Sequence, residues 1–218
     1  LAGIVNGTAN FILTEMRDMG ADFETALADA QRLGYAEADP TFDVEGIDAA
    51  HKLTLMGVTA FGIPFHFDRV YTEGISGISR EDIAYAEELG YSIKHLAIAQ
   101  RDESGVELRV HPTLIPRRRL IANVDGVMNA VLVYGDAVGH TMFYGAGAGA
   151  EPTASAVVAD LVDQARALAS EPCGRVPDLG FRPESIEDAE ILSMEAITTA
   201  YYLRRLVEDS PGVVADIT

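Results

Sequence analysis

The sequence predicts an α+β fold, with a mixed or antiparallel sheet and helices packed on one face of it. Two observations support this prediction. Apolar residues recur at helical spacing through much of residues 10–60, whereas residues 91–115 and 128–145 each hold two apolar runs divided by a short turn. Helices that precede hairpins along a chain are typical of α+β folds, because a parallel sheet would need strands and helices to alternate.

Three helices are expected in the first part of the chain. The first covers residues 10–19, and an Asn or Thr just before it can accept hydrogen bonds from its exposed amides. The second covers 23–33 and ends at Gly34. The third covers 44–60, with Asp43 as its expected cap.

The second part of the chain is expected to hold the sheet. A short helix at 80–90 precedes two apolar runs, 91–101 and 106–115, which form one predicted hairpin. Residues 128–145 form a second hairpin with Gly-Asp near its turn. A last helix is expected at 154–169, after a glycine-rich run.

Composition limits the possible partners and the location of the protein. The chain has 218 residues and a formal net charge of −18, which repels nucleic acids and anionic membranes. No apolar run reaches the roughly 18 residues that a bilayer span requires. Cys173 is the only cysteine, and CxxC and HExxH spacings are absent, so we expect no disulfide, no metal site and a cytoplasmic location.

The most informative stretch is residues 34–52, GYAEADPTFDVEGIDAAHK. Its last two charged residues, Asp48 and Lys52, are four positions apart and therefore share one face of the predicted helix. The simplest interpretation is a solvated ion pair worth about 0.3–0.5 kcal/mol. The charged residues of this stretch are Glu37, Asp39, Asp43, Glu45, Asp48 and Lys52.

A binding site is the second interpretation of the same stretch. Five carboxylates within twelve residues repel one another, which lowers stability unless cations or hydrogen-bond donors compensate. The ammonium group of a small substrate would compensate two or three of these acids. Lys52 would then interact with an oxygen that gains or loses a proton.

Several segments resemble one enzyme family. LGYAEADPTFDVEGIDAAHKL (33–53) resembles the signature of homoserine dehydrogenases, and so does GIVNGTANFILTEM (3–16). GAGAGAEPTASAVVADLVDQAR (145–166) resembles the segment of that family that closes the catalytic domain. AYYLRRLVEDSPGVVADIT (200–218) resembles the first strand and turn of an ACT domain.

The resemblance implies an activity and a set of roles. The reaction is the NAD- or NADP-dependent interconversion of L-homoserine and L-aspartate 4-semialdehyde, a step toward threonine, methionine and isoleucine. By matched positions, Glu37 and Asp43 bind the substrate amino group, while Asp48 and Lys52 contact the reacting oxygen. Further matched positions are Gly7, Thr8 and Tyr35 for the substrate and Gly149 and Thr153 for the cofactor.

The resemblance also implies a domain organisation. Residues 1–170 correspond to the catalytic and dimerisation domain, so a homodimer or higher homo-oligomer is expected. Residues 171–196, rich in Pro and Gly, are expected to form a linker, and 197–218 the truncated start of an ACT domain. No strand–GxGxxG–helix unit occurs in the sequence, so we expect a fragment that is inactive alone.

A second class of function is compatible with the same segments. The chain would then be a regulatory or dimerisation module that binds an amino-acid effector through the ACT-like tail. A strand and half a helix cannot bury a core by themselves, so the sequence favours the enzyme.

Overall fold

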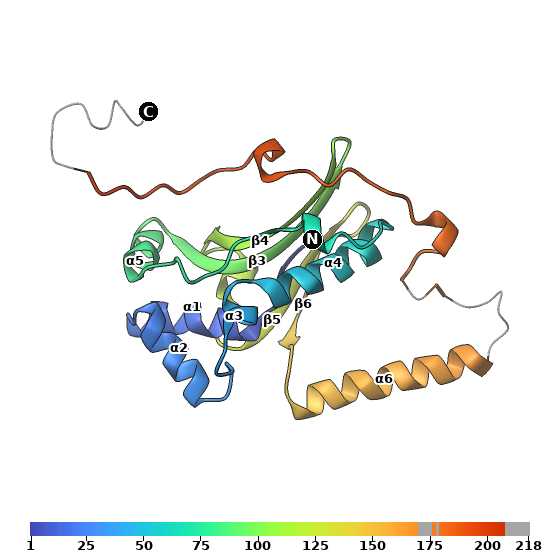
Figure 1. Ribbon diagram of the computed structural model, residues 1–218, viewed down its shortest axis with the longest axis horizontal. Helices are drawn as coiled ribbons and strands as arrows, with labels where there is room; N and C mark the ends of the chain where they lie inside the picture. The colour runs from blue at the N-terminus through green and yellow to red at the C-terminus, as the bar shows by residue number, and fades with distance from the viewer. Residues whose placement is uncertain (170–175, 178, 208–218) are drawn as a thin grey trace.

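The structure is a computed structural model that describes residues 1–169, 176–177 and 179–207. One six-stranded sheet has the order β2-β4-β3-β1-β5-β6, with β2 parallel to β4 and the other neighbours antiparallel. Helices lie on one face of this mixed sheet, as predicted (Figure 1). The strands are β1 Ala2–Ile4, β2 Tyr71–Thr72, β3 Tyr91–Asp102, β4 Gly105–Pro116, β5 Met128–Gly135 and β6 Gly139–Ala146.

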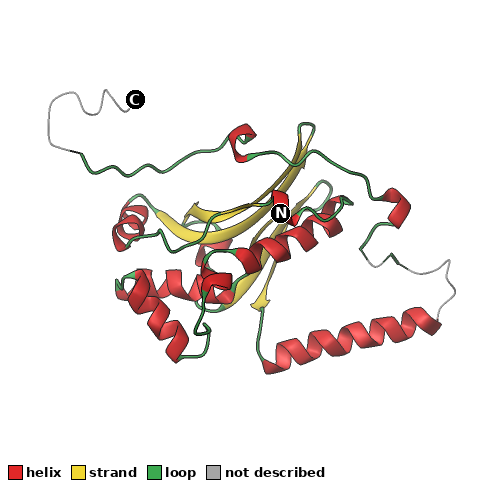
Figure 2. Cartoon of the chain, viewed as in Figure 1, coloured by secondary structure: helices red, strands yellow, loops and turns green. Residues whose placement is uncertain are grey.

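Helices and long loops make up the part of the described chain outside the sheet (Figure 2). None of the helices in the described residues is both long and apolar enough to cross a membrane. The α-helices are α1 Gly7–Met19, α2 Phe23–Arg32, α3 Thr41–Val44, α4 Ile47–Phe61, α5 Arg80–Glu88 and α6 Ala150–Ala169. The short 3-10 helices are η1 Phe67–Arg69, η2 Leu120–Asn123, η4 Pro183–Ser185 and η5 Met194–Ala196.

Two clusters of the core lie between the sheet and the helices α1, α4 and α5, and a third lies on the other face, where Ile121 of η2 packs with Leu96 of β3. Ile12 of α1 packs in one cluster with Ile83 of α5 and Ile93 of β3, and Leu53 of α4 packs in a second with Leu108 of β4. Burying each such side chain contributes about 1.5–3 kcal/mol. These two clusters hold α1 and α4 on the sheet.

The predicted hairpins are confirmed, because β3 pairs with β4 and β5 with β6 along their full lengths. Two of the predicted helices begin earlier than expected. Helix α1 begins at Gly7, since the Asn6 side chain caps it by accepting a hydrogen bond from Ala9 N at 2.7 Å. Helix α6 begins at Ala150, within the glycine-rich run.

The prediction of one helix over 44–60 with Asp43 as its cap is wrong. The chain forms two helices, α3 and α4, because Gly46 between them has a left-handed backbone with φ of 81°. A Cβ at Gly46 would also lie 3.0 Å from the His95 ring, so the turn packs directly on the sheet. Asp43 therefore lies inside α3. The turn at Gly46 brings its carboxylate near that of Asp48 of α4, so both accept hydrogen bonds from Asn6.

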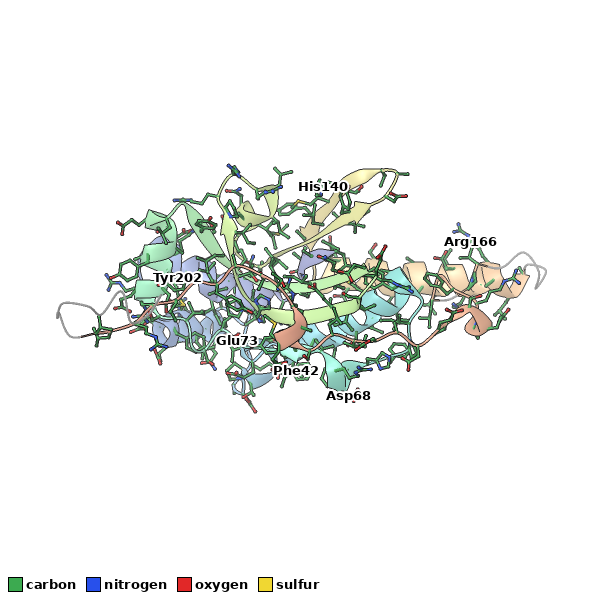
Figure 3. The ribbon with its side chains drawn as sticks, turned by 90° about the horizontal axis from the view of Figure 1, so that it is seen from above. Phe42, Asp68, Glu73, His140, Arg166 and Tyr202 are labelled. Carbon is green, nitrogen blue, oxygen red and sulfur yellow. The ribbon has the colours of Figure 1, made fainter. Side chains whose placement is uncertain are left out.

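The described part of the predicted linker packs against the domain. Val106 N donates to Glu190 O at 2.8 Å, Leu192 N donates to Val106 O at 2.9 Å, and Ile191 is buried. Farther along, Arg204 Nε donates to Asp82 Oδ1 at 2.7 Å, which holds the segment against α5. Figure 3 shows Tyr202, which also donates to Asp82, beside this helix.

Residues 197–207 contain no strand, so the expected ACT-like strand is not seen over that range. Residues 208–218 and Cys173 lie outside the described residues. The domain boundaries at 170, 171–196 and 197–218 therefore stay predictions.

A charged network around the buried Lys94 attaches α1 to the loop before β5. The Lys94 side chain, 1% exposed, donates to Val124 O at 2.6 Å and to Asp125 Oδ1 at 2.8 Å, and Arg17 donates to the same oxygen at 2.9 Å. Burial would raise the pKa of Asp125, but the hydrogen bonds from Arg17 and Lys94 outweigh it and lower that pKa. Burial lowers the pKa of Lys94, so its ammonium depends on these acceptors.

Replacing Asp125 should test this network. Because its pKa is lower in the folded state, Asp125 contributes stability that is complete above about pH 4, the ordinary pKa of Asp, and is lost as pH falls through the folded pKa. We expect Asp125→Asn to lower the free energy of unfolding by about 1–3 kcal/mol at pH 7, discounted because Asp125 is part-exposed.

Urea titrations between pH 3 and pH 7 measure this effect. The difference between the variant and the unsubstituted protein should shrink toward pH 3. Asp136→Asn, in the exposed turn between β5 and β6, is the matched control and should change stability by less than about 0.5 kcal/mol. Equal stability of the Asp125 variant and the control at pH 7 would contradict the assignment.

Candidate active site

The side chain of Asn6 joins three helices. It stands between β1 and α1, where it is 6% exposed. Besides capping α1, its Nδ2 donates to Asp43 Oδ1 of α3 at 2.7 Å and to Asp48 Oδ2 of α4 at 2.8 Å. Both amide hydrogens are thus used on two carboxylates that would otherwise repel each other.

Lys52 completes the cluster one turn along α4. Its Nζ donates to Asp48 Oδ2 at 2.7 Å and to Val5 O at 2.9 Å. The lysine side chain is 47% exposed and that of Asp48 is 21% exposed, so the pair lies at the surface of the domain rather than in its core. Helical spacing predicted this pair correctly, and the hydrogen bond to Val5, the residue after β1, holds the lysine at a second point.

The cluster retains unused hydrogen-bonding capacity. Within the described residues, Asp43 Oδ2 and Asp48 Oδ1 accept no hydrogen bond, and Lys52 uses two of its three donors. Two free carboxylate oxygens and one ammonium hydrogen can receive a ligand that carries both donors and acceptors. A small molecule with an amino group and an oxygen function matches this set.

The loop after α2 is attached to the same helix start. Thr8 Oγ1 donates to Tyr35 O at 2.6 Å, and the Tyr35 ring lies 5.0 Å from that of Phe11. Gln31 Nε2 donates to Glu37 O at 3.0 Å and fixes the loop further. The Glu37 side chain is exposed, and its carboxylate has no partner in the described residues.

The five acids of the stretch therefore separate into different roles. Asp43 and Asp48 meet at Asn6, and Glu37 is free at the tip of an attached loop. Asp39 instead accepts bonds from the backbone and hydroxyl of Thr41, which lower its pKa. Glu45 accepts from Ser76 Oγ at 2.7 Å, so its carboxylate is used outside the cluster of Asp48 and Lys52.

The glycine-rich run lies at the end of β6 and the start of α6. Gly149 precedes the helix, and its carbonyl accepts from Thr153 N at 3.0 Å. Both residues are exposed, and the hydrogen bonds that join the cluster do not extend to them in the described part of the chain. Gly7 follows Asn6 directly in the chain, and a Cβ on it would lie 2.8 Å from Val127 O at the entry to β5.

Asn6 is the residue that sequence reasoning missed as a site residue. Its expected role was helix capping, which the structure confirms, but capping uses only its oxygen. An Asn cap has two further amide hydrogens to donate, and the neighbouring acid-rich loop was the available signal. Only the tertiary structure places Asp43 and Asp48 within reach of these hydrogens.

The fold and the cluster define a class of protein. It is a mixed α/β protein in which charged side chains from several helix starts gather on the helix-bearing face of a sheet, with capacity left for a small polar ligand. Comparison with known proteins then gives the family. The family model described as Homoserine dehydrogenase matches residues 1–162.

Named relatives agree with this match. The homoserine dehydrogenase of Pseudomonas aeruginosa is 65% identical over 217 residues, which is 100% of this chain and 50% of the relative. The crystal structure of a homoserine dehydrogenase from Thiobacillus denitrificans is 65% identical with a TM-score of 0.91, over 99% of this chain and 50% of that one. A hyperthermophilic archaeal homoserine dehydrogenase in complex with NADPH is 26% identical with a TM-score of 0.61, over 74% and 46% of the two chains.

The chain belongs to the homoserine dehydrogenase family, an oxidoreductase family. It spans about half the length of the curated relatives it matches. The resemblance of the sequence to homoserine dehydrogenases is thereby confirmed, whereas the resemblance of residues 200–218 to an ACT domain stays a prediction. The roles of individual site residues are not tested by this similarity.

Substitutions at Asn6 should separate its two structural functions. Asn6→Ala removes the cap and the donor to both carboxylates, so we expect a loss of about 2–4 kcal/mol in the free energy of unfolding. Asn6→Ser keeps a capping oxygen but cannot donate to two acids, so about half of that loss should remain.

Chemical denaturation of the two variants measures this difference. Asp22→Ala is the control, because it removes only a cap, that of α2, whose oxygen accepts from Thr25 N. Asp22→Ala should cost about 1 kcal/mol. If Asn6→Ala cost no more than Asp22→Ala, the connection between α3 and α4 would be energetically unimportant.

Proposed function

We propose that this chain forms the homoserine-binding part of an NAD- or NADP-dependent homoserine dehydrogenase. The observation that carries the proposal is the cluster of Asn6, Asp43, Asp48 and Lys52, which has free acceptors beside a free ammonium hydrogen. Homoserine offers an ammonium group and a hydroxyl group a few bonds apart, and so matches both. Family membership supports the same substrate.

Lys52 is the proposed catalytic residue. In the reductive direction negative charge develops on the aldehyde oxygen, and an ammonium at hydrogen-bonding distance stabilises it. Asp48 holds Lys52 in place and contacts the hydroxyl side of the substrate. The second bond of Lys52, to Val5 O, keeps its Nζ directed toward the sheet.

The amino group of the substrate would be bound by Glu37 and Asp43. The carboxylate of Glu37 is unpaired among the described residues, and Asp43 keeps one free oxygen. Tyr35, Gly7 and Thr8 form the adjoining wall, because the Thr8–Tyr35 hydrogen bond joins their segments. Gly7 admits the close approach of β5 that a side chain would prevent.

The residues of the glycine-rich run fit a dinucleotide. Without side chains at 145, 147 and 149, the backbone there is open to close approach by a cofactor. Gly149 and Thr153 are the proposed contacts, and the related archaeal enzyme has been solved with NADPH. The nicotinamide supplies hydride transfer when bound, and binding of its phosphates would need the GxGxxG unit that this sequence lacks. We therefore expect no turnover by these 218 residues alone.

The face of the sheet that carries no α-helix, at β5 and β6, is the proposed homodimer surface. Strand register places Leu132 opposite Met142 and Tyr134 opposite His140 on that face. Tyr134 is 68% exposed there, so an apolar and aromatic surface is available for a second copy. Figure 3 shows His140 at the far side of the molecule from Phe42 of α3. A cytoplasmic location suits such a biosynthetic enzyme.

Lys52→Ala should abolish most activity. In a full-length enzyme that contains this chain, we expect kcat to fall by roughly 10²–10³-fold, the usual loss of one strong oxyanion donor. Circular dichroism should remain unchanged. Arg101→Ala is the matched control, since Arg101 is also an exposed cation that donates to a backbone carbonyl, that of Phe61. Near-normal turnover of a folded Lys52 variant would refute the assigned role.

Glu37→Gln should act on substrate binding instead. We expect the KM for homoserine to rise about tenfold or more while kcat changes by less than about threefold, since a charge-assisted bond is worth about 1.5–3 kcal/mol. Glu24→Gln, an exposed acid in the first turn of α2, is the control. An unchanged KM in the Glu37 variant would remove Glu37 from the site.

A further inference from the structure

Asn129 is a polar residue on the helix-bearing face of the sheet that no role described above includes. It lies near the start of β5 and pairs with Gly145 of β6. Two residues along β5, Val131 points to the same face and packs with the cluster that includes Val5 and Leu53. One step beyond the pair Ile4 and Ala130, the register brings Asn129 level with Val5, whose carbonyl accepts from Lys52.

The Asn129 side chain stands between two glycines. A Cβ built on Gly147 would overlap the Asn129 amide nitrogen and lie 2.5 Å from its Cγ. On the other side, a Cβ on Gly7 would lie 3.6 Å from Asn129 Oδ1. Asn129 thus separates the first residue of α1, next to Asn6, from the glycine-rich run at the end of β6.

The amide of Asn129 is also incompletely satisfied. Its Oδ1 is buried and accepts no hydrogen bond in the described residues. Such an acceptor lowers stability, so a small movement of the adjoining backbone that brings an N–H to it is favourable. The run 145–149, exposed from Ala146 onward, is the adjoining backbone, and it is free of side chains at 145, 147 and 149.

We propose that Asn129 is the positioning residue for the cofactor: its side chain seats Gly147 against the start of α1, so that the glycine-rich run and the Lys52 cluster face one ligand. The proposal rests on the proposed dehydrogenase function. The ligand class at this run is a nicotinamide dinucleotide. Asn129 does not touch the reacting atoms, and it acts through the backbone of the run.

The test uses the full-length enzyme that contains this chain, with NADPH and NADH as probes. Asn129→Leu keeps the size of the side chain and removes the amide, and Asn129→Ala removes both. We expect both to raise the Kd for the reduced cofactor, measured by fluorescence titration, roughly tenfold or more, with the homoserine KM within about twofold. Asn123→Ala is the control, because that exposed amide donates to Arg117 O and Arg119 O away from the run.

A double-mutant cycle separates positioning from general destabilisation. Gly147→Ala alone should weaken cofactor binding at least as much as Asn129→Ala, because its methyl group meets the amide. In the Asn129→Ala background the same change should add less than about twofold, since the methyl group then fills the vacated space. Strict additivity of the two changes would overturn the proposal, and so would unchanged cofactor affinity in folded Asn129 variants.

The proposed function is tested independently by the same preparation. A wild-type enzyme that binds NADPH but does not oxidise homoserine would refute the dehydrogenase assignment, while the cofactor titrations would still decide the role of Asn129. A Tm that falls together with equal rises in both KM values would show Asn129 to be merely structural.

Discussion

The geometry of this site depends on how one asparagine satisfies two carboxylates. Asp43 and Asp48 come from different helices, and their mutual repulsion would separate α3 from α4 if water alone compensated it. Asn6 donates one amide hydrogen to each and uses its oxygen to cap α1. Because all the hydrogen-bonding groups of this amide are used, the ends of three helices have one preferred relative position.

The same arrangement explains why the site lies at the helix starts. Hydrophobic clusters hold α1 and α4 on the sheet, and the left-handed turn at Gly46 brings α3 back toward α1. Charged side chains then gather where helix dipoles favour negative charge. The single ammonium of Lys52 offsets only part of this negative charge, and the remaining free oxygens are available for a ligand. Structural stability and ligand recognition thus use the same residues.

Two further attachments make this face of the sheet rigid. The Lys94–Asp125–Arg17 network joins β3, the loop before β5 and α1. On the opposite edge, residues 190–192 pair with Val106 and Arg204 binds Asp82. Helix α6 differs from the others, since none of its described side chains is buried and it extends away from the body (Figure 1). Its exposed apolar residues fit a family whose members are about twice this length.

The sequence by itself determined the elements that local pattern controls. Helical spacing predicted α1, α2 and α5, and pairs of apolar runs divided by a short turn predicted the two long hairpins. The spacing of Asp48 and Lys52 predicted their ion pair. The motif at 34–52 also determined the family. These features arise from interactions between residues that are close in the sequence, so the sequence alone is enough to predict them.

Tertiary structure decided the rest, because it depends on contacts between residues far apart in the chain. The strands β1 and β2 are too short to be recognised and exist only through pairing with β3, β4 and β5. The break at Gly46 needed the sheet beneath it. The second function of Asn6 and the position of Asn129 also depend on distant residues. The acceptors of Asn6, Asp43 and Asp48, lie about 40 positions along the chain, so only the folded structure brings them within hydrogen-bonding distance.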